Sequence, residues 1–234
     1  MHVDELVDAV LMMMHQIDDF EKLAQKKFPA LGNRNIHIVS PEISALAGGL
    51  GRMMQYVIRA YKKLGLKTVS HQPYYLYQMD QRGYLSARID YADSLYSPLK
   101  VDETPVYTFT ITVQNQPVIV DMYRALDEDG SVSYLYRDRG DFFVKGLYCY
   151  DESGNGLPNE FVFCEFFTKS VLMGVTFIEQ EAKRKSPKTW QPPVMYLQDG
   201  QSALAAVWPL FLREYQNEIT LLMEYAFCTH TYFN

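Results

Sequence analysis

A glycine-rich turn is the part of this sequence whose residue types and spacing best suit chemistry. The run Ile36–Val39 leads through Ser40-Pro41-Glu42 to Ala47-Gly48-Gly49-Leu50-Gly51, and a helix-like segment follows over residues 53–64. A strand, a turn and a helix in this order bring backbone N–H groups and a helix N-terminus toward a phosphate. The spacing differs from the dinucleotide-binding G-x-G-x-x-G. The pattern alone therefore leaves open an anion-binding turn and a tight turn without a ligand.

The elements that would position this turn alternate between strands and helices. Apolar and β-branched runs predict strands over residues 35–39, 67–70, 194–197 and 219–229. A 3.6-residue period predicts helices over residues 53–64, 160–181 and 202–215. The alternation predicts an α/β fold with a doubly wound, mostly parallel sheet. Ligands of such sheets bind beyond the carboxyl ends of the strands, and these ends carry residues 42–51, 72–75 and 198–201 together with His230.

Two further regions complete the predicted organisation. Residues 1–30 carry apolar side chains at intervals of three and four and predict an amphipathic helix, either packed on the domain or used for self-association or a partner. Residues 106–113 and 118–123 predict a β-hairpin, and the polar residues 124–158 predict loops and short strands at one edge of the sheet. We therefore expect one lobe over residues 35–234 with a β-hairpin and a loop-rich edge.

The histidines and cysteines show few catalytic or metal-binding arrangements. The sequence contains no H-x-x-x-H spacing and no G-x-S-x-G turn. His37 lies inside a predicted strand, where we expect a buried side chain with satisfied hydrogen bonds. His71 and His230 lie at predicted strand ends and are candidates for a binding site. The three cysteines, at positions 149, 164 and 228, lack metal-ligand spacing and are expected to be buried thiols.

Composition excludes several other classes of protein. The 234 residues are 48% hydrophobic and carry a net charge of −6, which is unlike the concentrated basic surface of a nucleic-acid-binding protein. No apolar run approaches the roughly 20 residues of a membrane-spanning helix, so no membrane partner is expected. Acidic residues near the N-terminus are unlike a secretory signal. We therefore expect a cytoplasmic protein.

Four motifs in order give the chain a resemblance to bacterial glycogen synthases and plant starch synthases. The first runs from Ile36 to Tyr75: a strand, S-P-E, a G-G-L-G turn, a helix and a second strand ending in a P-x-Y loop. Leu147-Tyr148 and Pro158–Phe163 are similar to the tyrosine-rich loop and the D-N-x-x-R-F motif of that family. Gln198–Leu204 is similar to H-D-W-Q-T-A-L, and Thr229-His230-Thr231 lies where the family has T-I-H-N. α-Glucan phosphorylases share part of this pattern.

The resemblance implies one Rossmann-like lobe of a two-lobe glycosyltransferase. In that family the N-terminal lobe binds an α-glucan or maltooligosaccharide acceptor, and the C-terminal lobe binds the sugar nucleotide. We therefore expect no cofactor here, because ADP- or UDP-glucose would bind only with a second lobe outside the given sequence. The implied contacts with the diphosphate or the transferred glucose are Gly48, Gly49 and Leu50. The implied sugar-binding residues are Asn159, Gln198, Asp199 and His230, with Tyr75 as a stacking platform.

Departures from the family pattern leave the catalytic residues unknown. The family has a lysine before its paired glycines, whereas Leu46-Ala47 precedes Gly48 here. That lysine stabilises the leaving group as a point charge. The histidine of H-D-W is replaced by Gln198, an amide that can hydrogen-bond a hydroxyl but cannot carry a proton charge.

Two functions therefore remain open. The chain is either the acceptor lobe of a glucosyltransferase, inactive by itself, or a carbohydrate-binding or regulatory lobe without catalysis. Transfer of a glucosyl group from a nucleotide-sugar needs positive charge around the leaving diphosphate, and the missing lysine removes one source of it. The continuation of the reading frame beyond Asn234 is the observation that would separate the two.

Overall fold

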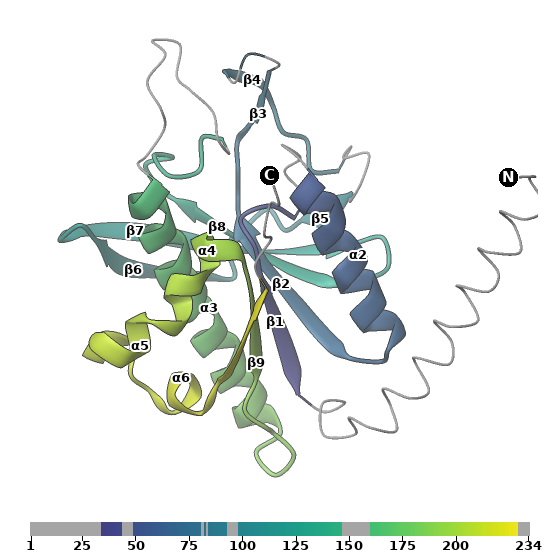
Figure 1. Cartoon of the computed structure of the whole chain (residues 1–234), viewed down its shortest axis with the longest axis vertical. Coiled ribbons are helices and arrows are strands. Elements are labelled where there is room, and N and C mark those ends of the chain that lie inside the picture. The colour runs from purple at the N-terminus through teal and green to yellow at the C-terminus, as the bar shows by residue number, and fades with distance from the viewer. Residues whose placement is uncertain are drawn as a thin grey trace, which may run out of the picture.

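The computed structural model describes residues 34–43, 49–80, 82, 84–92, 98–146 and 160–228. The predicted helix of residues 1–30 lies outside the described residues, as do Gly48, Asn159 and His230. Figure 1 shows the described part as a central sheet with helices on both of its faces.

In the described residues the main sheet has eight strands, and most of them are parallel. Its order is β10-β9-β1-β2-β8-β7-β5, with β6 paired to β7. The five strands from β10 to β8 pair in parallel, whereas β5, β6 and β7 form an antiparallel extension at one edge. The bounds are β1 Asn35–Val39, β2 Lys67–Pro73, β5 Leu99–Val101, β6 Tyr107–Val113, β7 Gln116–Asp127, β8 Val132–Asp138, β9 Val194–Gln198 and β10 Glu224–Cys228. A separate hairpin pairs β3 Tyr77–Met79 with β4 Leu85–Arg88.

Helix α2 (Gly49–Lys63) covers one face of the sheet. Met54 and Ile58, one helical turn apart, are buried against Ile36 and Ile38 of β1. Gly65 follows the end of the helix, and its φ of 72° is the left-handed conformation that closes many helices. Leu66 N–H donates to the Tyr61 carbonyl across that turn. The predicted strand–turn–helix unit is therefore confirmed where it is described.

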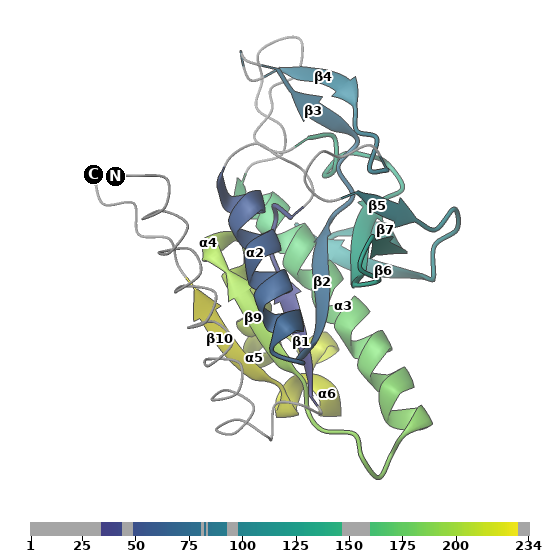
Figure 2. The same ribbon diagram turned by 90° about the vertical axis from the view of Figure 1, so that its right-hand side faces the viewer.

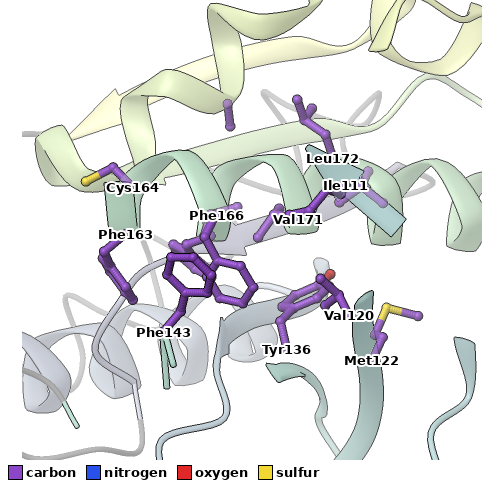
Figure 3. Packing of buried hydrophobic residues seen from close by; sticks show 14 of the residues in the cluster. Ile111, Val120, Met122, Tyr136, Phe143, Phe163, Cys164, Phe166, Val171 and Leu172 are labelled. Atoms are coloured by element: carbon purple, nitrogen blue, oxygen red, sulfur yellow. The ribbon is translucent and has the colours of Figure 1, made fainter. Parts of the chain in front are cut away.

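Helix α3 (Glu160–Lys185) covers the opposite face and carries much of the core. Figure 3 shows aromatic residues of α3 in the core, where the Phe166 ring stacks on Phe143 of the segment after β8 with centroids 4.5 Å apart. By length and composition alone, α3 is long and apolar enough to cross a membrane. The expectation that no apolar run approaches the length of a membrane-spanning helix is therefore wrong. The most apolar window of α3 is 61% buried inside the fold, as in the core helix of a soluble protein.

The predicted helix over residues 202–215 is wrong, because that segment is broken into short pieces. Pro209, near the start of α5, cannot continue a helix from the preceding turn. Asn217 then caps α6 through its side chain, so the predicted strand over residues 219–229 begins with a helix. The pieces are α4 Asp199–Ala203, the 3-10 turn η1 Leu204–Ala206, α5 Trp208–Phe211, the 3-10 turn η2 Arg213–Tyr215 and α6 Glu218–Leu222.

Two boundaries of the predicted sheet also differ. Strand β2 continues through Gln72 and Pro73, which are expected in a loop. The polar segment expected as loops and short strands at one edge contains β8, which lies inside the sheet between β2 and β7. The predicted hairpin is confirmed as β6 and β7, but its turn consists of Gln114 and Asn115, both at positive φ, and Pro117 already belongs to β7.

Candidate functional site

The strand order creates a topological switch point between β1 and β9. From β1 the chain crosses through α2 on one face of the sheet to reach β2. From β9 it crosses through α4, α5 and α6 to β10, and α4 and α6 contact α3 on the other face. Figures 1 and 2 show the helices diverging in this way. Open α/β sheets bind ligands beyond the carboxyl ends of strands at such a point.

Glu42 follows β1 at the switch point and is the most unusual group there. Its side chain is only 4% exposed, and no described residue forms a hydrogen bond with its Oε2. Burial raises the pKa of Glu42 to about 7. The hydrogen bond from the Gly51 backbone N–H acts to lower it, and the nearby charge of Asp199 acts to raise it further. At neutral pH the carboxyl group therefore populates both its neutral and its ionised form.

Local hydrogen bonds hold the turn after β1 in place. The Glu42 N–H donates to Ser40 Oγ at 3.3 Å, and Ser40 Oγ donates to the Glu42 carbonyl at 3.0 Å. Gln55 Nε2 of α2 donates to the Ile43 carbonyl at 2.9 Å. The start of α2, where the first N–H groups have no carbonyl partner within the helix, is thus fixed relative to the end of β1.

Gln198 and Asp199 form the matching turn at the end of β9. Asp199 has a φ of 60°, a backbone conformation that residues other than glycine seldom adopt and that recurs at functional sites. Gln198 is fully buried, and its Nε2 donates to Asp199 Oδ1 at 3.0 Å. Ser202 Oγ donates to the Gln198 carbonyl at 2.5 Å. This network orients a carboxylate at the switch point opposite Glu42.

The arrangement suits binding of sugar hydroxyls better than binding of an anion. A carboxylate accepts hydrogen bonds, and a neutral carboxylic acid also donates one, so the pair Glu42 and Asp199 can hold hydroxyl groups of either orientation. Two carboxyl groups at one strand edge repel a diphosphate. Across the described ranges, no group of three His, Cys, Asp or Glu side chains is placed to hold a metal ion.

The sequence-predicted site residues fall into three groups. Gln198 and Asp199 lie together at the switch point, and Gly49 and Leu50 begin α2 beside it. Gly48, Asn159 and His230 lie outside the described residues, so their roles remain predictions. Tyr75 is only 1% exposed and stacks on Phe163, so its ring offers no open face for a sugar and its role as a stacking platform is corrected.

His71 is a core residue, which corrects its prediction as a site candidate. It belongs to a buried chain of hydrogen bonds, Glu179–His37–His71–Tyr136, in which neighbouring polar atoms are 2.9, 2.8 and 2.7 Å apart. Burial, together with the neighbouring His37, lowers the pKa of His71 well below 6.5. The expectation of a buried, hydrogen-bonded His37 is confirmed.

Glu42 is the residue that sequence reasoning does not select. The sequence does contain a feature that could have pointed to Glu42. It is a carboxylate three residues after the last residue of a buried strand and ahead of a glycine-rich helix start. The proximity of Asp199 is not visible in the sequence, since 157 positions separate the two residues and only the parallel pairing of β1 with β9 brings them together.

These features define a class of protein: a Rossmann-like α/β domain with polar side chains at its switch point. Residues 35–233 match the family model of the starch synthase catalytic domain. The chain belongs to this family.

A solved structure shares the fold. The catalytic domain of starch synthase IV from Arabidopsis thaliana, determined with bound ADP and acarbose, superposes with a TM-score of 0.54 at 17% sequence identity. The match covers 85% of this chain and 34% of that chain, so the present chain spans about a third of the length of its structural relative. A comparison with curated protein sequences gives no significant match.

Proposed function

We propose that this chain acts as the N-terminal, acceptor-binding lobe of a starch- or glycogen-synthase-type glucosyltransferase. Its ligand is an α-1,4-glucan or maltooligosaccharide, and the nucleotide-glucose donor, with ADP or UDP as carrier, requires a second lobe. Membership of the starch synthase family supports the ligand class. The relative that binds ADP and acarbose has about three times the length matched here, which supports the need for a further lobe.

The observation that carries this proposal is the pair of carboxyl groups at the switch point. Glu42 has a buried oxygen without a described partner, and the Asp199 carboxylate is oriented by Gln198 at 3.0 Å. A glucan offers rows of hydroxyl groups that both donate and accept hydrogen bonds, and such groups satisfy a carboxylate and a neutral carboxylic acid equally well.

A second candidate function has a specific observation in its favour. The same acidic pair disfavours a diphosphate, and no lysine precedes the paired glycines as it does in the family pattern. A carbohydrate-binding or regulatory lobe without catalysis would keep the sugar contacts and lose the phosphate contacts. The reading frame beyond Asn234 distinguishes the two candidates: a second lobe with a cationic donor site supports the enzyme.

Titration of the full chain with maltoheptaose, followed by amide NMR shifts, tests the proposed ligand. We expect shifts around Gly51 and Asp199 and a dissociation constant in the millimolar range, equivalent to about 4 kcal/mol. ADP should bind more weakly at the same residues. Asp199→Asn should weaken glucan binding about tenfold, which is worth about 1.4 kcal/mol.

The matched control is Glu181→Gln, which removes an exposed carboxylate near the end of α3. That end of α3 precedes β9 and lies at the amino ends of the strands, away from the switch point. If ADP produces shifts around Asp199 and maltoheptaose produces none, the acceptor-lobe proposal is wrong.

A further inference from the structure

A cavity of about 310 Å³ opens on the α2 face of the sheet, and its lining reaches Ile43, the residue after Glu42. It lies between α2 and the part of the sheet formed by β2, β8 and β5, and its lining includes none of Glu42, Gln198 or Asp199. Figure 2 shows α2 and β5 on the two sides of this region. The volume is near the lower end of the range for small-molecule pockets.

The cavity has a polar floor and an apolar wall. Ser70 of β2 and Ser133 of β8, both buried, line it with hydroxyl groups that are hydrogen-bonded to each other at 2.5 Å. Ile43, Ile58 and Leu99 supply apolar surface beside them. Each hydroxyl oxygen has two acceptor lone pairs and one proton. A mutual hydrogen bond therefore leaves the pair able to bind a further polar group.

The rim carries opposite charges that do not pair with each other. Arg59 of α2 lines the cavity and forms no hydrogen bond or ion pair with any described residue. Asp127 at the end of β7 lines it, together with Glu128 and Asp129 of the turn that follows, and no ion pair joins these three residues to Arg59. Charges of both signs that form no ion pair with each other leave donors and acceptors for a ligand that bridges them.

Contacts between α2 and the β7–β8 turn hold this rim in place. Lys62 Nζ donates to the Asp129 carbonyl at 2.5 Å and to Ser131 Oγ at 3.2 Å. Ser131 N–H donates to Asp127 Oδ1 at 2.6 Å. The turn that carries the three carboxylates is therefore tied to the helix that carries Arg59, and the cavity is preformed.

We propose that this cavity binds a neutral polyhydroxylated molecule of monosaccharide to disaccharide size. Each hydroxyl of such a molecule both donates and accepts a hydrogen bond, which matches a lining that mixes hydroxyl, guanidinium and carboxylate groups. Three carboxylates against the Arg59 guanidinium and the Lys62 ammonium leave the rim with a net negative charge, which disfavours phosphate esters. The site goes beyond the proposed function, because it lies on the α2 face and uses none of the switch-point side chains.

Titration of the full chain with D-glucose and maltose, read by amide NMR shifts, tests this site. We expect shifts at Arg59, Ser131 and Ser133 with millimolar affinity. Arg59→Gln and Asp129→Asn should each weaken glucose binding about fivefold, the effect of one hydrogen bond. Both replacements are on exposed side chains, so folding should be retained. Arg213→Gln, an exposed arginine in η2 on the other face, is the matched control and should change nothing.

Parallel titrations decide the ligand class and separate the two proposals. Tighter binding of inorganic phosphate or of glycine than of glucose at Arg59 would overturn the polyol assignment, as would the absence of shifts with either sugar. Shifts at Asp199 with maltoheptaose, without shifts at Arg59 with glucose, refute this inference alone. Shifts at Arg59 with glucose, without shifts at Asp199 with maltoheptaose, refute the proposed acceptor site alone. Loss of glucose shifts in Arg59→Gln, with maltoheptaose shifts at Asp199 retained, supports both.

Discussion

Glu42 shows how a single side chain links the fold to pH. Burial raises the pKa of this carboxyl group from 4.5 to about 7. The folded protein therefore holds this proton more tightly than the unfolded chain does. Stability from the neutral form is fully present below pH 4.5 and is lost as the pH rises toward and through 7. The difference of pKa corresponds to about 3 kcal/mol.

Glu42→Gln should remove this pH dependence. The neutral amide does not ionise, so we expect the variant to gain stability relative to the wild type as the pH rises from about 4.5 to 8, by up to about 3 kcal/mol. Urea unfolding at several pH values measures the difference. Asp199→Asn should move the wild-type transition to lower pH, because it removes the charge that helps to raise the pKa of Glu42. If the difference in stability between Glu42→Gln and the wild type stays constant across this pH range, the raised pKa of Glu42 is contradicted.

Glu179 is the charged end of the buried chain of hydrogen bonds. Burial acts to raise its pKa, but the hydrogen bonds from His37, Asn35 and Trp190 and the His37 charge together lower it. Its side chain is 1% exposed, so a lost contact leaves buried polar groups unsatisfied.

We predict that Glu179→Gln destabilises the fold by about 3 kcal/mol, because the charge-assisted hydrogen bond to His37 is lost. Denaturant unfolding measures the change. Glu181→Gln, two residues away and exposed at the helix surface, should leave the unfolding midpoint unchanged. Equal effects of the two substitutions would show that the buried chain of hydrogen bonds contributes little to the stability of the fold.

At the scale of elements, α3 approaches the sheet closely at Gly174. A Cβ atom placed there would overlap the Tyr136 hydroxyl oxygen and would lie 2.8 Å from Met122 Sδ. Figure 3 shows Tyr136 and Met122 side by side beneath the helix. The glycine therefore sets the distance between α3 and strands β7 and β8.

Gly174→Ala should destabilise the protein by about 2 kcal/mol, because the helix or Tyr136 must move. This loss exceeds the gain of about 1 kcal/mol in helix propensity. Gly200→Ala in α4 is the matched control, since nothing lies within 4 Å of the position that its Cβ would occupy, and it should be neutral or stabilising. Thermal unfolding of both variants gives the comparison, and a stabilised Gly174→Ala would contradict the close approach.

The elements that the sequence predicts are those whose signal is local. The β1–α2 unit and α3 are marked by hydrophobic periodicity and glycine, and both are confirmed. Strand β8 belongs to residues 124–158, which are predicted at an edge of the sheet because they are polar. Its polar side chains instead pair with partners on β2, as Ser133 does with Ser70 and Tyr136 with His71. Such partners are far away in the sequence, and periodicity within one segment does not contain them.

The distinction between local signals and neighbours that are far away in the sequence also holds for the site and for the whole molecule. Asp199 is predicted from the family resemblance and lies among the residues expected after a strand, whereas its proximity to Glu42 depends on the strand order. Sheet order is a property of the complete chain, because β9, which comes late in the sequence, pairs with β1 on the side opposite to β2. A side chain's position after a strand is therefore predictable, and its neighbours are not.

For the whole molecule, we predict that the purified 234-residue chain does not elongate glycogen from ADP-glucose. Glucosyl transfer from a nucleotide depends on positioning and on positive charge near the leaving diphosphate. The described switch point instead carries Glu42 and Asp199, and the chain spans 34% of its structural relative. Incorporation of labelled glucose into glycogen measures the activity. Incorporation that Asp199→Asn abolishes would show that this chain is catalytic by itself, whereas incorporation that survives the substitution would indicate a contaminating synthase.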